Sequence, residues 1–145
     1  MAKKIVIDVI TKIKIKDIVE IWYKVEKSND SSEVKFSSPR VPHSDFVKAF
    51  STLKDSFVST MEFDESYGDN VEVTGLSMSY SPEGDRSVII SGKKELFNGT
   101  TCFNTPKIVS NIELENKILE IETEAYKYMF EGKEAQEKIN FEEGI

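Results

Sequence analysis

Residues 71–90, VEVTGLSMSYSPEGDRSVII, give the strongest indication of the fold, because two strand patterns flank a clear turn signal. Apolar and polar residues alternate on both sides of the turn, as they do in strands that bury one face. The alternation changes parity at Gly75, and a β-bulge at this glycine would reconcile the two halves of the first strand. The turn itself is the sequence SPEGD at residues 81–85. We therefore predict a β-hairpin, whose apolar positions are Val71, Val73, Leu76, Met78, Tyr80, Val88, Ile90 and Leu96.

Alternation also predicts strands near the N-terminus. Residues 5–15 place apolar side chains on one face and Lys12, Lys14 and Lys16 on the other. Residues 17–27 repeat the pattern, so we expect a hairpin that turns near Lys16 and Asp17. A polar cluster at residues 28–32 reads as a turn before a short strand at residues 33–36. The apolar set comprises Ile5, Ile7, Val9, Ile13, Ile15, Val19, Ile21, Tyr23 and Val25.

Two amphipathic helices complete the predicted elements. The first begins at Ser44 as N-cap, after a Pro-containing loop, and the second begins with a capping box of Ser110 and Glu113 and ends at Gly132. The acidic segment between residues 62 and 70 is predicted to be irregular. Apolar residues recur at helical spacing in both helices. They are Phe46, Phe50, Leu53 and Phe57 in the first and Leu114, Ile118, Ile121, Ala125, Tyr128 and Met129 in the second.

This order of elements predicts an α+β fold, with an antiparallel sheet of about four to five strands and two helices packed on one face. The length of 145 residues fits a single domain that spans residues 1–145. Residues 133–145 are expected to form a short docking helix or a frayed end, since Ile139 and Phe141 would prefer a surface to pack on.

Composition bounds the classes of function. The 19 Lys and Arg residues against 26 Asp and Glu residues give a net charge of −7, which repels nucleic acid unless positive charge gathers on one face. A single cysteine and a single histidine cannot build a disulfide within the chain or a four-ligand zinc site. No run approaches the ~20 apolar residues of a membrane span, and the first residues lack a signal-peptide core. These features predict a cytoplasmic protein.

Catalysis and metal binding receive little support from the sequence. His43 would have to act as a general base beside Ser44 or the distant Cys102. A Pro-flanked histidine before a helix is more often a local cap, and a lone cysteine is more often a small buried hydrophobe. The acidic residues between 62 and 69 lack calcium-loop spacing, and the glycine-rich phosphate motifs are absent. We therefore expect a protein that is not an enzyme and has no cofactor or metal.

A row of lysines on the first strand is a candidate nucleic-acid surface. Lys12, Lys14 and Lys16, with Trp22 and Lys24 on the neighbouring strand, match the lysine-and-aromatic faces of single-strand binders. The more common meaning of such a row is an edge strand that lysines protect against aggregation. Both interpretations stay open.

A second candidate site would bind a small polar ligand. The segment at residues 98–107 is rich in amide and hydroxyl groups and is stiffened by Pro106, and the only two arginines could supply charge. The alternative is that this segment only turns the chain into the last helix. The candidate ligand-binding residues are Arg40, His43, Arg86, Asn98, Asn104, Thr105 and Lys107.

Four stretches together carry a resemblance to a known group of proteins. They are VPHSDF at residues 41–46, VTGLSMSY at residues 73–80, its return strand VIISG at residues 88–92, and FNTP at residues 103–106. The combination resembles uncharacterised small proteins encoded by bacteriophages and prophages of gut bacteria. It covers about half of the chain, and none of its pieces is a catalytic signature. The resemblance implies a phage origin and no established activity.

The resemblance and the missing catalytic parts lead to one expectation and one alternative. The expectation is a non-enzymatic, homo-oligomeric binding protein in the host cell cytoplasm that inhibits host antiviral defence, by sequestering a small nucleotide signal or by occluding a host protein. The alternative is an accessory factor in phage replication or recombination that touches single-stranded nucleic acid through the lysine row and Trp22.

Overall fold

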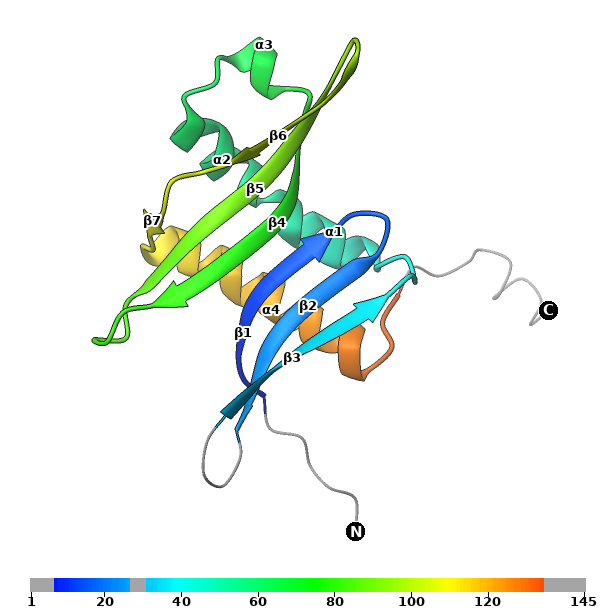
Figure 1. Ribbon diagram of the computed structural model, residues 1–145, viewed down its shortest axis with the longest axis vertical. Helices are drawn as coiled ribbons and strands as arrows, with labels where there is room; N and C mark the ends of the chain where they lie inside the picture. The colour runs from blue at the N-terminus through cyan, green and yellow to red at the C-terminus, as the bar shows by residue number, and fades with distance from the viewer. Residues whose placement is uncertain (1–6, 27–30, 135–145) are drawn as a thin grey trace, which may run out of the picture.

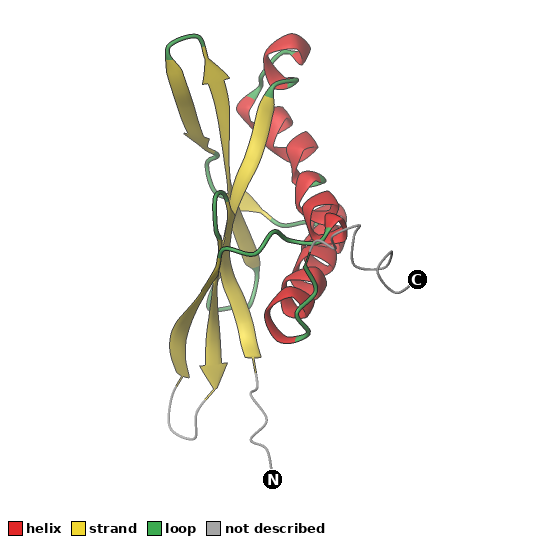
Figure 2. Ribbon diagram, turned by 90° about the vertical axis from the view of Figure 1, so that its right-hand side faces the viewer, coloured by secondary structure: helices red, strands yellow, loops and turns green. Residues whose placement is uncertain are grey.

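The computed structural model describes residues 7–26 and 31–134, which form an antiparallel sheet with helices on one of its faces (Figures 1 and 2). The strands lie in the order β3-β2-β1-β4-β5-β6, and the short β7 pairs with β5. The predicted α+β class is confirmed, and the sheet has more strands than predicted. The strands are β1 (Ile7–Ile15), β2 (Val19–Glu26), β3 (Ser31–Ser38), β4 (Val71–Tyr80), β5 (Arg86–Leu96), β6 (Gly99–Asn104) and β7 (Ile108–Val109). The helices are α1 (Ser44–Ser51), α2 (Leu53–Met61), α3 (Glu65–Gly68) and α4 (Ile112–Phe130).

Two three-stranded units meet at the centre of the sheet. The first unit, β1-β2-β3, pairs with the second, β4-β5-β6, only through β1 and β4, which run antiparallel with Lys12 opposite Ser77, Ile13 opposite Leu76 and Lys14 opposite Gly75. The extra strands are β6 and β7, because residues 99–104, expected to be a loop, pair along β5 as β6 and Ile108–Val109 also pair with β5. Strand β3 was predicted, and it is longer than the expected 33–36.

The glycine bulge in β4 is confirmed. Pairing with β5 shifts register between Val73 and Gly75, and a Cβ at Gly75 would lie 3.3 Å from Cβ of Ser91. Strand β1 departs from the prediction, since it has register irregularities between Ile7 and Val9 and between Ile10 and Lys12. Ile10 is therefore buried in the core, where simple alternation placed Val9.

The predicted first helix is divided at Thr52 into α1 and α2. The Thr52 hydroxyl donates to the Ala49 carbonyl at 2.6 Å, and side-chain bonds of this kind compete with the helical backbone pattern and bend helices. The apolar stripe survives the break, because Phe46, Phe50 and Leu53 are all buried. The N-cap is His43, whose Nδ1 accepts from the Asp45 amide at 3.0 Å, so the prediction of Ser44 is wrong by one residue.

Helix α4 covers the sheet as predicted, with one change at its start. The N-cap is Asn111, which accepts from the Leu114 amide at 2.9 Å, while Ser110 donates its hydroxyl to Glu115. The capping box of Ser110 and Glu113 is therefore wrong. Leu114, Ile118, Ile121, Ala125, Tyr128 and Met129 are all buried in the core.

Two further predictions concern the acidic segment at residues 62–70 and the C-terminal end of the chain. Residues 65–68 form the short α3 inside the segment that was expected to be irregular. The predicted docking segment lies largely outside the described residues, which end at Glu134. None of the described helices is long and apolar enough to cross a membrane.

Candidate functional site

The face of the sheet away from the helices, here called the outer face, carries the alternate residues of each strand. Successive side chains in a strand point to opposite sides. On β1, Ile10 and Ile13 turn into the core, and Lys12 and Lys14 turn outward. The register of β1 against β2, and of β2 against β3, determines which side chains lie next to these lysines. Lys12 lies opposite Trp22 on β2, and Trp22 lies opposite Lys35 on β3. The tryptophan therefore has a lysine on each flanking strand.

Three ammonium groups surround the partly buried ring of Trp22. The distances from Nζ to the ring centroid are 5.1 Å for Lys12, 5.7 Å for Lys14 and 5.2 Å for Lys35. Cations within about 6 Å of a ring centroid are attracted by the ring's negative face. The contacts hold the four side chains together as an aromatic and cationic cluster.

Glu20 lies beside this cluster and responds to its charge. Its carboxylate is 2.7 Å from Nζ of Lys35. The hydrogen bond from Lys35 is the main cause that lowers the pKa of Glu20, and the charges of Lys35, Lys14 and Lys12 act in the same direction. The positive potential of the outer face is therefore partly, and only locally, neutralised.

A polar hollow of about 340 Å³ adjoins the cluster on the outer face of β1, β4, β5 and β6. Lys12, Lys14 and Lys16 line it from β1 and the turn that follows. Its opposite wall includes Ser91 and Asn104, and the Ser91 hydroxyl donates to the amide oxygen of Asn104 at 2.6 Å. Lysines thus face hydroxyl and amide groups across an open depression.

The structure brings most of the predicted nucleic-acid residues together. Lys12, Lys14 and Trp22 share the cluster, and Lys16 borders the adjoining hollow. Lys24 is exposed on the next outward position of β2, where its cross-strand neighbour is Glu33. Lys24 therefore adds little net positive charge.

Sequence reasoning missed two parts of this site. Lys35 falls within the predicted strand at residues 33–36, and the alternation in that strand places it on the outer face, but it is not among the predicted binding residues. Ser91 carried no chemical signal, because its place beside Asn104 depends on the register of β5 against β6.

The predicted charged ligand residues lie on the helix side or beside it. Arg40 contacts Glu134, with Nη1 to Oε1 at 3.4 Å, and lies over the Tyr128 ring. His43 caps α1. Arg86 starts β5 and reaches α4, where its Nη1 lies 3.5 Å from Glu122. Burial raises the pKa of Glu122, against the opposing effect of this arginine. The two arginines therefore connect the strands to α4 and to the residues that follow it, whereas His43 acts within α1.

The remaining predicted ligand residues are distributed along one edge of the fold. Asn98 lies in the turn between β5 and β6, and Asn104 lies on the outer face. Thr105 is buried and its hydroxyl accepts from the Ile90 amide at 3.0 Å, while Lys107 is exposed in the following loop. Thr105 and Lys107 belong to the connection towards α4. The seven predicted residues do not converge on one hollow among those found in the described part of the chain.

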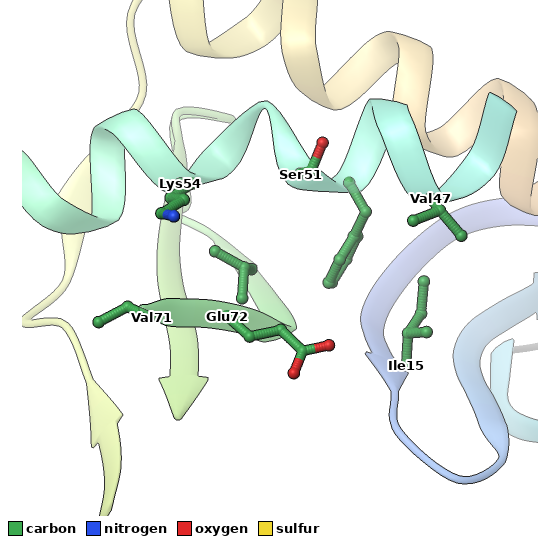
Figure 3. A pocket seen from close by; sticks show the side chains of 8 residues that line it. Ile15, Val47, Ser51, Lys54, Val71 and Glu72 are labelled. Carbon is green, nitrogen blue, oxygen red and sulfur yellow. The ribbon is translucent and has the colours of Figure 1, made fainter. Parts of the chain in front are cut away.

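A second hollow, of about 280 Å³, lies on the helix side between the end of β1 and the start of β4 (Figure 3). Ile15 and Val47 border it on one side and Val71 on the other. Polar groups are few, and Lys54 uses its ammonium group to donate to the Asp69 carbonyl at 2.9 Å. The outer hollow gathers more ammonium, hydroxyl and amide groups than this one, so it is the better candidate for a polar or phosphate-bearing ligand.

The proposed catalytic partners occupy different parts of the fold. His43 precedes α1, whereas Cys102 lies on β6 and lines the outer hollow. Cys102 is exposed, so the expectation of a buried cysteine is wrong. Within residues 7–26 and 31–134, no group of three or more His, Cys, Asp or Glu side chains is placed to hold a metal ion.

Comparison with known proteins gives no family assignment for this fold and site: no protein-family model, no curated protein and no solved structure matches the chain.

Proposed function

We propose that the outer face binds single-stranded nucleic acid. The observation that carries the proposal is the Trp22 ring with Lys12, Lys14 and Lys35 around it. An aromatic ring offers a stacking platform for an unpaired base, and the lysines offer charge to the phosphates on either side of it.

An open sheet face favours a single strand over a duplex. Reading a duplex through its major groove requires an inserted helix or β-ribbon, whereas unpaired bases can spread over a sheet and stack on its aromatic residues. Neighbouring strands lie about 4.8 Å apart, so the path from β3 to β6 across the outer face is on the order of 24 Å. That length accommodates several nucleotides, with Trp22 near one end and the outer hollow near the other.

The acidic character of the whole chain limits the strength of this binding. The net charge of −7 repels phosphates at long range, and the outer-face lysines act at contact. Binding therefore depends steeply on salt. Together with the resemblance to phage proteins, this supports a role as an accessory factor in phage DNA replication or recombination.

One observation favours a second candidate function. The outer hollow, at about 340 Å³, falls within the ~300–1,000 Å³ range of small-ligand sites. A protein that inhibits host defence by sequestering a nucleotide signal would use the hollow for the phosphates and Trp22 for the base. The two candidates share their chemistry and differ in the length of ligand that they need.

Competition against a fluorescently labelled 12-nucleotide DNA at low salt separates them. Single-strand binding predicts that unlabelled competitors improve with length from one to twelve nucleotides and that the matching duplex competes poorly. Signal sequestration predicts that a mononucleotide or cyclic dinucleotide competes as well as the 12-mer.

Variants of the lysine row test whether these residues are needed for binding. Changing Lys12, Lys14 and Lys16 to Glu should abolish binding of the labelled DNA under either candidate. Failure of the unaltered protein to bind any of these ligands at low salt would remove both.

A further inference from the structure

Helix α4 has a second apolar stripe that does not face the sheet. Its core stripe is buried, yet Ile112, Leu119 and Tyr126 are 82%, 64% and 45% exposed. They are seven residues apart, and Phe130 follows at 39% exposure, with one edge of its ring against Tyr23 of β2. An amphipathic surface helix normally presents charged and polar residues opposite its core stripe.

The exposed stripe has the spacing of a coiled-coil seam. Its members, here called the α4 seam, are Ile112, Asn116, Leu119, Thr123, Tyr126 and Phe130, separated by steps of four and three residues. This average of 3.5 residues lets one helix pack along another over many turns.

Both polar members of the seam suit a helix interface. Thr123 already donates its hydroxyl to the Leu119 carbonyl at 2.9 Å, so burying it leaves no hydroxyl donor unpaired. Asn116 resembles the single asparagine that sets register in many coiled coils.

We propose that the α4 seam binds the α4 seam of a second copy of this chain, with the two helices antiparallel. In this orientation Ile112 faces Phe130 of the partner copy, Asn116 faces Tyr126, and Leu119 faces Thr123. The apolar residues at the two ends of the seam, Ile112 and Phe130, then contact each other across the two copies.

Charge on the flank of the seam favours this occupant. The flank carries Glu113 near the N-terminal end, 83% exposed and 3.8 Å from Lys117, and Lys127 near the C-terminal end, 38% exposed and 3.9 Å from Glu124. Ion pairs within one surface helix are weak, so both groups can exchange partners in a dimer. An antiparallel copy places each Glu113 opposite the other copy's Lys127, and it also aligns the helix dipoles favourably. Glu120, midway between them, faces its own counterpart and opposes the association.

The size of the seam fixes the class of complex. A helical stretch from residue 112 to residue 130 is about 27 Å long and, with side chains, about 10 Å wide. Its footprint of about 270 Å² is well below the ~800 Å² per partner of a standard stable interface. The dimer is therefore weak, and the fraction of protein in the dimer rises with protein concentration. Because the helices lie on one side of the sheet (Figure 2), it leaves both outer faces free and directed away from each other.

Sedimentation equilibrium of the full chain, up to about 1 mM protein, tests the proposal. The unaltered protein should show a monomer–dimer equilibrium, and Leu119→Lys should remove it. The matched control is Leu96→Lys, which places the same charge at a leucine 48% exposed on β5 and should leave the equilibrium unchanged. Far-ultraviolet circular dichroism checks that the variants are folded.

The charge arrangement has its own test, because Glu120→Gln removes the like-charge contact between the two copies on this flank. The antiparallel dimer should strengthen several-fold in this variant. A strict monomer at about 1 mM, an unchanged dimer in Leu119→Lys, or a weaker dimer in Glu120→Gln would each overturn the proposal.

Discussion

Neutralising two lysines of the outer face should change the salt dependence of nucleic-acid binding by a calculable amount. Four lysines, Lys12, Lys14, Lys16 and Lys35, border the Trp22 ring or the outer hollow. At about 0.7 counterions released per contact for single strands, they predict that log K falls against log salt with a slope of about −3. Changing Lys12 and Lys14 to Gln should reduce the slope to about −1.4. At ~0.1 M salt the same change should weaken binding about 25-fold.

Fluorescence anisotropy of a labelled 12-nucleotide DNA, titrated at several salt concentrations, measures both quantities. The matched control changes Lys48 and Lys117 to Gln, because these residues lie on α1 and α4 and the loss of net charge is the same. An equal loss in the control would mean that only net charge matters. An unchanged slope in the double variant of β1 would refute the assignment of the lysines to phosphates.

Three further predictions concern the ring, the core and pH. Trp22→Ala should weaken binding of the labelled DNA by about 1–3 kcal/mol for one stacked base, while Trp22→Phe retains most of it; equal affinity in Trp22→Ala argues against stacking. A Cβ at Gly92 would lie 2.8 Å from Cζ of Phe57, whereas nothing lies within 4 Å of one at Gly99. Denaturant unfolding should therefore show that Gly92→Ala costs about 1–3 kcal/mol and Gly99→Ala less than about 0.5, and equal costs would contradict the close packing. Burial raises the pKa of Glu122 above its ordinary value of 4.5, so the folded state holds this proton more tightly than the unfolded chain. The unfolding free energy of the natural protein should accordingly rise relative to that of Glu122→Gln as pH falls through the raised pKa towards 4.5, and a constant difference would count against it.

The fold class was predictable because apolar periodicity survives in most elements. Strand β2 has no bulge, so Val19, Ile21 and Tyr23 alternate cleanly and are all buried. Strand β1 contains two irregularities, and a period of two cannot show which residue is skipped, so Ile10 was not assigned to the core. The break at Thr52 was hidden for a similar reason, since the apolar stripe continues through it.

Strand β6 shows how pairing overrides local composition. Its sequence GTTCFN is rich in Thr, Asn and Gly, which favoured a loop. Pairing with β5 places Cys102 opposite Lys93 and turns the cysteine to the outer face. The sequence contains no local sign of this partner, so neither the strand nor the exposure of Cys102 could be predicted.

The sequence predicts the part of the candidate site that follows from alternation within a strand. It does not predict which residues from different strands and loops lie close together. Parity alone placed Lys12, Lys14 and Trp22 on one face of the N-terminal strands. The dispersed ligand residues, such as Arg40 and Asn98, were grouped by chemical type. Sequence gives no distance between loops at different ends of a sheet.

Trp22 can report nucleic-acid binding at the outer face directly, because it is the only tryptophan in the chain. Its intrinsic fluorescence reports on the outer face without any label. Single-strand binding at the outer face predicts that a single-stranded 12-mer at low salt changes this fluorescence saturably and that added salt reverses the change. Binding seen by anisotropy with no change in Trp22 fluorescence would place the nucleic acid elsewhere and refute binding at the outer face.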